Sequence, residues 1–368
     1  MMFDLDFNQQ PLLLIWETTR SCALACRHCR AEAIDQRDPG ELTTDEGKRL
    51  LDDTREMGTP LVIFTGGDPL QRDDLEELIR YGKSIGLRCG TIPATTDRLT
   101  QERVESLKAA GLDQMAISID GSTPEKHDGF RGVPGSFEKA MQAAEWAHAC
   151  ELPLQVNTVF AGWNENDFDA MAKLVTDLKI VFWEVFFLVP TGRGKVMGNC
   201  MTEQYEALFA KLYDLSKRAD FIIKVTEAPH YRVYVARQER AAARTAEETD
   251  ALHHHHGHKA IGSAHHGQAG RAKRALMGVN AGKGFCFVDH TGNVCPSGFL
   301  DEKCGNVRET SVIDIYRNHP VFCQLRDVSL LKGVCGRCRH AELCGGSRAR
   351  AWAMTGDMLA EEPFCSYG

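Results

Sequence analysis

The chain has 368 residues, of which 43% are hydrophobic, and a net charge of -8 at neutral pH. This length can bury one large core, or one large and one small core. The acidic balance excludes a general attraction to nucleic acid or anionic lipid. The N-terminal residues lack the basic segment of a secretory signal, and the apolar run at 12–16 is too short to cross a bilayer. Fourteen cysteines in such a chain favour metal or redox chemistry over disulfides. We therefore expect a soluble cytoplasmic protein with no nucleic-acid partner and no membrane span.

Short apolar runs alternate with segments of helical period from about residue 11 to 226. Strands are expected at 12–17, 61–65, 87–92, 114–119, 154–160, 181–189 and 220–225. The first helix begins at Thr43, where Glu46 completes a capping box, and stops at Gly58. Further helices are expected at 73–85, 100–110, 136–149, 165–178 and 202–218. These repeats predict an α/β fold, a partial (β/α)6 barrel of the TIM type.

The regular pattern ends near residue 237. Residues 237–278 are rich in Ala, Glu, Arg and His and poor in large apolar side chains, which predicts a flexible linker or surface insertion. We therefore expect a barrel domain at 11–236, a linker at 237–281 and a small metal-supported domain at 282–368. The linker histidines are expected to form a solvated tract, with metal delivery as the alternative. They are His253, His254, His255, His256, His258, His265 and His266.

Unusual residues follow several of the predicted strands. In parallel β/α folds, ligands bind beyond the carboxyl ends of the strands. A cysteine cluster follows the first strand, Gly-Gly-Asp-Pro (66–69) the second, and Asp120-Gly121 the fourth. Asn157 lies near the end of the fifth strand, and Thr-Gly-Arg-Gly (191–194) follows the sixth. We expect all of them to share one face of the barrel.

Three cysteines at a C-x3-C-x2-C spacing form the cluster after the first strand: Cys22, Cys26 and Cys29. Thiolates are the usual ligands of iron–sulfur clusters, and three of them leave one iron of a four-iron cluster open. The alternative is a zinc site that borrows His28 or a distant ligand.

This spacing after a first barrel strand resembles the radical S-adenosylmethionine (SAM) enzymes. The resemblance implies a [4Fe-4S] cluster whose open iron chelates SAM. One electron, from a donor such as flavodoxin or ferredoxin, then yields a 5′-deoxyadenosyl radical that abstracts a hydrogen atom from substrate. The chemistry belongs to the cluster and SAM, so no catalytic side chain is assigned.

The resemblance also implies which residues form the SAM pocket. Gly66, Gly67 and Asp68 match the turn that receives the amino group of SAM, with Asp in place of the commoner Glu. The remaining candidates are His28 against the cluster edge, Ser118 and Asp120 near the ribose and methionine portions, Arg131 at the carboxylate, Asn157 at the ribose and Val189 near the adenine. Asp68 as a helix cap, Arg131 as a surface residue and Asn157 as a strand polar group are the alternatives.

A second cysteine set lies near the C-terminus, at Cys335, Cys338, Cys344 and Cys365. Four thiolates complete a closed site, for zinc or for iron and sulfur. The stretch resembles the SPASM or twitch extension of radical SAM enzymes, which implies one auxiliary [4Fe-4S] cluster. Two cysteines of the full SPASM pattern are replaced, by Arg348 and by Ser297.

Three further cysteines of this region, evenly spaced, are expected to be ordinary buried or half-exposed thiols. They are Cys286, Cys295 and Cys304, with an unusual further cluster as the alternative. His230 has two interpretations, as a substrate contact or as a core residue.

Several phrases favour the tetrapyrrole branch of the family, among them LVPTGRG (188–194), GNVCPSGFL (292–300) and CGGSRARAWAMTGD (344–357). The expected activity is oxidation or decarboxylation of a tetrapyrrole side chain. A maturase acting on a ribosomal peptide is the second hypothesis, although few residues precede the first strand to grip a leader peptide. A non-catalytic iron–sulfur or metal-binding scaffold is the third.

Overall fold

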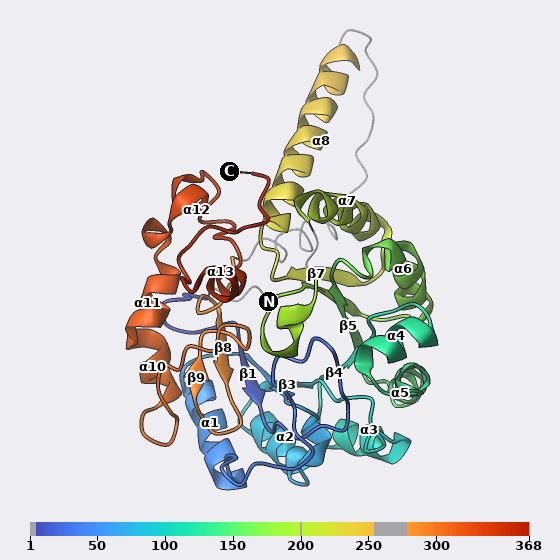
Figure 1. The fold of residues 1–368 in the computed structure, drawn as a ribbon, viewed down its shortest axis with the longest axis vertical. Helices are drawn as coiled ribbons and strands as arrows, with labels where there is room; N and C mark the ends of the chain where they lie inside the picture. Colours follow the sequence, from blue (N-terminus) through green and yellow to red (C-terminus); the bar gives the residue numbers. More distant parts are fainter. Residues whose placement is uncertain (1–4, 199–200, 254–277, 368) are drawn as a thin grey trace.

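The structure, a computed structural model, describes residues 5–198, 201–253 and 278–367. Its centre is one curled sheet of nine strands in the order β7-β6-β5-β4-β3-β2-β1-β8-β9 (Figure 1). Neighbours are parallel except for β8 and β9. The strands are β1 (Leu13–Glu17), β2 (Leu61–Thr65), β3 (Arg88–Thr91), β4 (Gln114–Ser118), β5 (Leu154–Phe160), β6 (Phe182–Phe187), β7 (Ile222–Thr226), β8 (Phe285–Val288) and β9 (Val294–Cys295). The expected partial (β/α) barrel is confirmed.

Helices connect the strands and cover the outer face of the sheet (Figure 1). They are α1 (Thr44–Glu56), α2 (Leu75–Ser84), α3 (Gln101–Ala109), α4 (Pro124–Arg131), α5 (Ser136–Ala149), α6 (Phe168–Asp177), α7 (Thr202–Arg218) and α8 (Tyr231–His253). The capping box that begins α1 is present, since the Thr43 amide donates to Glu46 at 2.8 Å and the Glu46 amide donates to the Thr43 hydroxyl at 3.3 Å. Helix α4 was missed from the sequence, although Thr123 as cap and Pro124 in the first turn are its signals.

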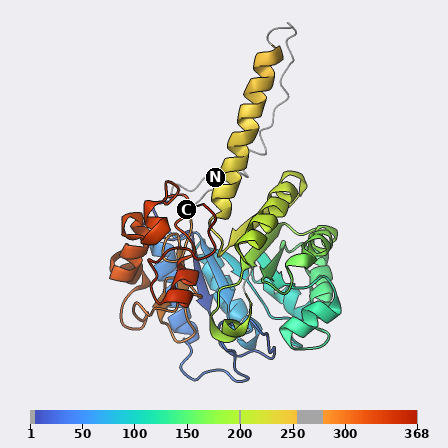
Figure 2. The same cartoon turned by 45° about the horizontal axis from the view of Figure 1, so that its top comes forward.

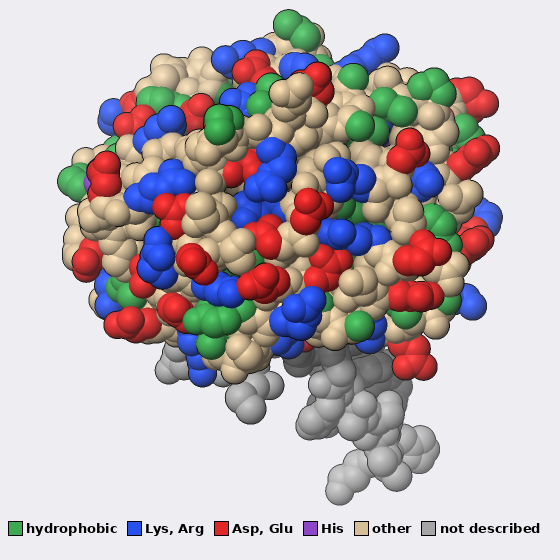
Figure 3. All heavy atoms as spheres, turned by 90° about the horizontal axis from the view of Figure 1, so that it is seen from below, with side chains coloured by type: hydrophobic (Ala, Val, Ile, Leu, Met, Phe, Trp, Pro, Cys, Tyr) green, Lys and Arg blue, Asp and Glu red, His purple; other side chains and the backbone are tan. Residues whose placement is uncertain are grey.

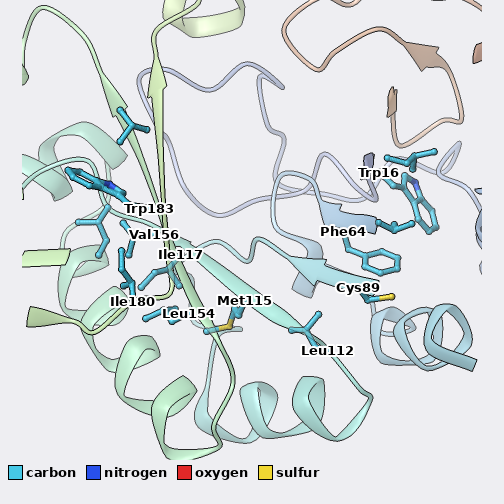
Figure 4. Close-up of a cluster of buried hydrophobic side chains, with 14 of the residues drawn as sticks. Trp16, Phe64, Cys89, Leu112, Met115, Ile117, Leu154, Val156, Ile180 and Trp183 are labelled. Carbon is cyan, nitrogen blue, oxygen red and sulfur yellow. The ribbon is translucent and has the colours of Figure 1, made fainter. Parts of the chain in front are cut away.

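The core lies between the sheet and these helices. Figure 4 shows Trp16 and Phe64 at one end of it, and Val156 and Trp183 at the other. These four side chains are fully buried. The one polar atom of the Trp183 ring is satisfied, because its N–H donates to the Thr158 hydroxyl at 2.9 Å. An apolar core of this kind fixes the strands whose ends carry the site.

Two strands of the C-terminal region, β8 and β9, extend the barrel sheet beyond β1. Strand β8 pairs in parallel with β1, from Leu13 opposite Phe285 to Trp16 opposite Val288. The buried side chains of Cys286 and Val294 belong to the same hydrophobic core as the barrel strands. The helices of this region are α10 (Val312–Asn318), α11 (Pro320–Arg326), α12 (Gly333–Arg337) and α13 (Arg348–Thr355).

Residues 237–253 continue helix α8, where the sequence predicted the start of a flexible linker. Figures 1 and 2 show this helix projecting from the body of the protein. Its stretch RQERAAARTAEE consists largely of strong helix formers, and this propensity explains the difference. Residues 254–277 lie outside the described part of the chain, and most of the histidine tract falls there.

The surface carries charges of both signs. In Figure 3, which views the protein from below, acidic and basic side chains are interspersed. Among the described residues, no helix is both long and apolar enough to span a membrane.

One buried ion pair joins the C-terminal region to the end of β6. The Arg350 guanidinium lies 3.1 Å from the Glu362 carboxylate, and both side chains have no exposed surface. Arg350 also donates to the backbone carbonyls of Phe187 at 3.3 Å and Leu188 at 3.2 Å. Although burial opposes ionisation of Glu362, the Arg350 charge holds its pKa below the ordinary value. The pair therefore stays charged and ties α13 to the barrel.

We predict that Arg350→Met destabilises the protein strongly, because Glu362 would remain buried as an unpaired charge. The cost of breaking such a pair is about 3–5 kcal/mol. The measurement is the thermal midpoint of the anaerobic protein, with limited proteolysis to detect release of the C-terminal region. Lys332→Met is the matched control, because its pair with Asp357 is well exposed and contributes little. Equal midpoints for both variants would contradict the prediction.

Candidate functional site

The loop of Cys22, Cys26 and Cys29 follows β1 and is held by its own backbone. The Cys22 amide donates to the carbonyl of Ile34 at 2.9 Å, and the Cys29 amide donates to that of Cys26 at 3.2 Å. Cys26 is buried, and the other two thiols are half-buried. Burial raises the pKa of Cys22 to about 12 in the absence of a bound cation. A bound metal would offset this effect by stabilising the Cys22 thiolate.

Two glycine turns press against this loop from the ends of neighbouring strands. A Cβ on Gly67, after β2, would lie 2.5 Å from the carbonyl oxygens of Arg20 and Ser21. A Cβ on Gly192, after β6, would lie 2.5 Å from the carbonyl oxygen of Cys29. Only glycine permits both approaches, and Gly192 also has a φ of 50°. The turns predicted to surround the cysteine loop thus lie beside it.

The first cysteine site offers the sulfur atoms hydrogen-bond donors. The Leu24 amide lies 3.4 Å from the sulfur of Cys22, and the Arg131 guanidinium lies 3.6 Å from that of Cys26. Donors and a cation beside sulfur stabilise the thiolate form that iron–sulfur clusters need. Within the described residues, no group of three or more His, Cys, Asp or Glu side chains could hold a single metal ion. Three cysteine thiolates with donors beside them fit a [4Fe-4S] cluster.

Arg131 and Asp120 form a buried ion pair next to Cys26. Although burial opposes ionisation, the Arg131 charge holds the pKa of the Asp120 carboxyl below its usual value. Asp120 also accepts from the Val159 amide at 2.7 Å. Arg131 is therefore a buried, paired residue rather than a surface residue, and its role toward the carboxylate of SAM stays a prediction.

Asp68 directs its carboxylate into the protein. One oxygen accepts from the amides of Leu70 at 3.1 Å and Ala94 at 3.3 Å, and the other accepts from the Thr96 hydroxyl at 2.7 Å. The side chain is fully buried, and burial raises its pKa. It caps the short 3-10 helix at 69–71, which is close to the alternative weighed above. Its role toward the SAM amino group stays a prediction.

The other predicted SAM contacts lie at the same face. Ser118 ends β4 and is opposite Asn157 of β5. Asn157 accepts from the Gln155 amide group at 2.7 Å, so the strand already satisfies its oxygen. Val189 follows β6 and packs in a small cluster with Leu300 and Ala349 of the C-terminal region. The structure makes Ser118 and Asn157 neighbours, while the contacts of all three residues with SAM stay predictions.

His28 belongs to an aromatic stack that the sequence analysis did not find. Its ring lies on Phe130 at 4.5 Å between centroids, and Phe130 lies on Trp163 at 4.5 Å. Burial, followed by the Arg131 charge, lowers the pKa of His28 to about 4, so the ring is neutral at pH 7. Phe130 is on α4 and Trp163 follows β5, so no sequence spacing links them to the cysteine loop. His230, in contrast, is fully buried beneath Tyr205 and is a core residue.

The second cysteine set also converges. Cys335, Cys338, Cys344 and Cys365 line one cavity. Each sulfur accepts a hydrogen bond from one backbone amide. Cys335 accepts from Glu362 at 3.3 Å. At 3.4 Å each, Cys338 accepts from His340, Cys344 from Gly346 and Cys365 from Tyr367. Buried Arg348 adds its guanidinium at 3.9 Å from the sulfur of Cys335. Four thiols with a donor apiece fit a closed cluster.

Three further C-terminal cysteines are buried thiols in or next to the sheet extension. Cys286 and Cys295 lie on β8 and β9, and Cys304 follows them. Burial, and to a lesser extent the other two thiols, raises the pKa of Cys286 well above its ordinary value. Ser297, which replaces a SPASM cysteine, is likewise buried and accepts from the Phe299 amide at 3.1 Å.

Comparison with known proteins shows the family to which this chain belongs. The sequence profile of the Radical SAM superfamily matches residues 16–175. An AdoMet-dependent heme synthase of Oleidesulfovibrio alaskensis is 41% identical over 96% of this chain and 87% of its own. The chain belongs to the radical SAM superfamily. As a radical SAM enzyme, the protein uses SAM and a [4Fe-4S] cluster.

More distant similarities extend over the same length. A PqqA peptide cyclase of Methylocella silvestris is 30% identical over 96% of this radical SAM enzyme and 87% of its own chain. The crystal structure of Streptococcus suis SuiB bound to S-adenosylmethionine has a TM-score of 0.73 and 14% identity, covering 97% of this chain and 78% of that one. At this identity SuiB supports the fold alone.

We predict that the anaerobic enzyme holds about eight irons, as two four-iron clusters require. Cys22→Ala should leave about four irons and abolish the EPR signal that SAM perturbs, because the three-cysteine site then lacks a ligand. Cys344→Ala should remove about four irons, those of the second cluster, and leave the SAM-sensitive EPR signal. Cys323→Ala is the control, since this exposed thiol belongs to neither set. A chain with four irons and one zinc would contradict the assignment of the C-terminal set.

Proposed function

We propose that this enzyme converts propionate side chains of a porphyrin into vinyl groups, as the last step toward a haem-type product. The observation that carries the proposal is the 41% identity with an AdoMet-dependent heme synthase over 96% of the chain. The matched part also makes up 87% of that relative's own length. An activity on a tetrapyrrole also agrees with the expectation from the sequence phrases.

We infer that Cys22, Cys26 and Cys29 hold the catalytic cluster and that the turn at Gly66 and Gly67 borders the SAM that binds its open iron. When bound, the cluster and SAM supply the radical that takes one hydrogen atom from the substrate. The protein residues position and shield this chemistry. The buried pair of Asp120 and Arg131 keeps a cation beside Cys26, and the stack at His28 excludes water from one side of the loop.

The proposed conversion balances as an oxidative decarboxylation. The carbon next to the ring loses a hydrogen atom, the side chain then gives up one electron, and its carboxylate leaves as carbon dioxide, forming the vinyl double bond. The electron needs a one-electron acceptor. An auxiliary [4Fe-4S] cluster held by Cys335, Cys338, Cys344 and Cys365 would supply one. The electron that starts the reaction comes, in this proposal, from an external donor such as flavodoxin or ferredoxin.

Peptide modification is the second candidate. It is favoured by the 30% identity with a PqqA peptide cyclase over nearly the whole chain. The two candidates differ in what the site must admit, since a porphyrin is a flat ring with acidic side chains and a peptide is an extended chain.

The decisive assay is anaerobic incubation of the loaded enzyme with SAM, a low-potential reductant and an iron porphyrin that carries four propionates. We expect the porphyrin mass to fall by carbon dioxide and two hydrogen atoms per converted side chain, with one 5′-deoxyadenosine formed each time. Cys22→Ala should abolish both products, and Cys323→Ala should abolish neither. SAM cleavage without any change in porphyrin mass would contradict the porphyrin proposal and favour the peptide one.

We also predict that Arg348 raises the reduction potential of the auxiliary cluster. Its buried guanidinium faces the sulfur of Cys335, and a nearby positive charge stabilises the more negative reduced cluster. Arg348→Gln should lower the midpoint potential by roughly 50 mV, close to the 59 mV that corresponds to a tenfold change for one electron.

The measurement is a potentiometric EPR titration of the auxiliary cluster in the Cys22→Ala background, with the iron content checked in each variant. Arg348→Lys keeps the charge and should shift the potential less. A variant that keeps its four irons and its potential would show that Arg348 only braces the loop, through the carbonyls of Met358 and Ala360.

A further inference from the structure

The turn after β6 carries buried polar atoms that no described residue satisfies. They are the Thr191 hydroxyl oxygen and the Nε and Nη2 nitrogens of Arg193. Buried polar groups in native proteins are almost always hydrogen-bonded, and a buried cation needs an anion or several acceptors. Unsatisfied donors in one short turn therefore indicate a missing partner.

The two nitrogens of Arg193 form the edge of the guanidinium that binds carboxylates with two parallel hydrogen bonds. The same edge is used twice elsewhere in this protein. In Arg72, Nε and Nη2 donate to the two oxygens of Asp74 at 2.9 and 2.6 Å. In Arg308, they donate to the two oxygens of Glu46 at 2.7 and 3.0 Å. Arg193 presents this edge without an acid among the described residues.

The backbone fixes the turn beside the cysteine loop. The Arg193 amide donates to the Cys29 carbonyl at 3.1 Å, and Gly192 has no room for a side chain against that same carbonyl. A Cβ on Gly194 would lie 3.7 Å from the Cα of His28, whose Nδ1 is also buried without a partner. Arg193 is therefore placed next to the loop that is inferred to hold the catalytic cluster.

Two neighbouring arginines, Arg131 and Arg30, do not compete for an added carboxylate, because each already has one. Arg131 is paired with Asp120, and Arg30 lies 2.6 Å from Glu17. Binding an anion at Arg193 leaves these pairs intact.

We propose that Thr191 and Arg193 form a carboxylate-binding site at the catalytic face. Two carboxylates are available there, a propionate of the porphyrin, which rests on the proposed function, and the methionyl carboxylate of SAM. Either would accept two hydrogen bonds from the Arg193 edge and one from the Thr191 hydroxyl. A propionate held in this way would have its carbon atoms close to the radical. The site would therefore select porphyrins that carry acidic side chains.

Binding measurements on the iron-loaded enzyme test the site and separate the two carboxylates. Affinity for SAM is measured by calorimetry, and affinity for the iron porphyrin with four propionates by absorbance titration. We expect Arg193→Gln to weaken one of them by about 10- to 100-fold, as loss of hydrogen bonds to a charged group does. Arg193→Lys, which keeps the charge but not the edge, should lose less. Arg218→Gln, an exposed arginine at the end of α7, is the control and should change neither.

The methyl ester of the same porphyrin identifies the carboxylate. If the propionate is the ligand, wild type and Arg193→Gln bind the ester equally, and only the free acid discriminates between them. If SAM is the ligand, only the SAM affinity falls. The site is overturned if both affinities stay within about twofold of wild type in a variant that retains its iron. Thr191→Val gives a second test should Arg193→Gln fail to load iron. A wild-type enzyme that binds no porphyrin would contradict the proposed function, and the SAM measurement would then decide on the site alone.

Discussion

The close approach of two backbone turns to the cysteine loop is the constraint on which the rest of the site depends. Gly67 and Gly192 come from β2 and β6, strands on opposite sides of the curled sheet, and both touch carbonyls of the same loop. A Cβ at either position would lie only 2.5 Å from a carbonyl oxygen of the loop, so the loop would have to move away. The barrel core therefore fixes the positions of the strand ends, and the strand ends in turn fix the position of the cysteine loop.

The two cysteine sites have the same kinds of electrostatic contacts at their sulfur atoms. In each, one sulfur faces a buried arginine, Arg131 at Cys26 and Arg348 at Cys335. Backbone amides supply further donors to the sulfurs. Iron–sulfur clusters carry net negative charge, so cations and donors at the sulfurs offset the cost of placing that charge in a low-dielectric interior. A radical SAM enzyme must be able to reduce its open cluster and must also keep that cluster bound. Cations and hydrogen-bond donors at the sulfurs favour both, because they stabilise the negatively charged cluster.

Local sequence signals were enough for the barrel strands β1 to β7, for most helices between them and for the gathering of the cysteines. The capping box at Thr43 and the apolar strand at 154–160 are properties of adjacent residues, and they were predicted correctly. Contacts between segments that are far apart in the sequence were not predicted. The pairing of Arg131 with Asp120 and Cys26, and the inward turn of Asp68 toward Thr96, depend on three-dimensional neighbours that no spacing reveals. Helix α8 was misread because its composition is typical of linkers as well as of solvated helices.

The pairing of β1 with β8 has a consequence for how the protein is made. Strand β1, which carries the cysteine loop at its end, has β2 on one side, but its other edge stays open until Phe285–Val288 have left the ribosome. Contacts between residues so far apart in sequence form late and slow folding. An open edge is also a site for wrong pairing with other chains. The growing chain thus displays its cysteine loop long before the sheet around it can close.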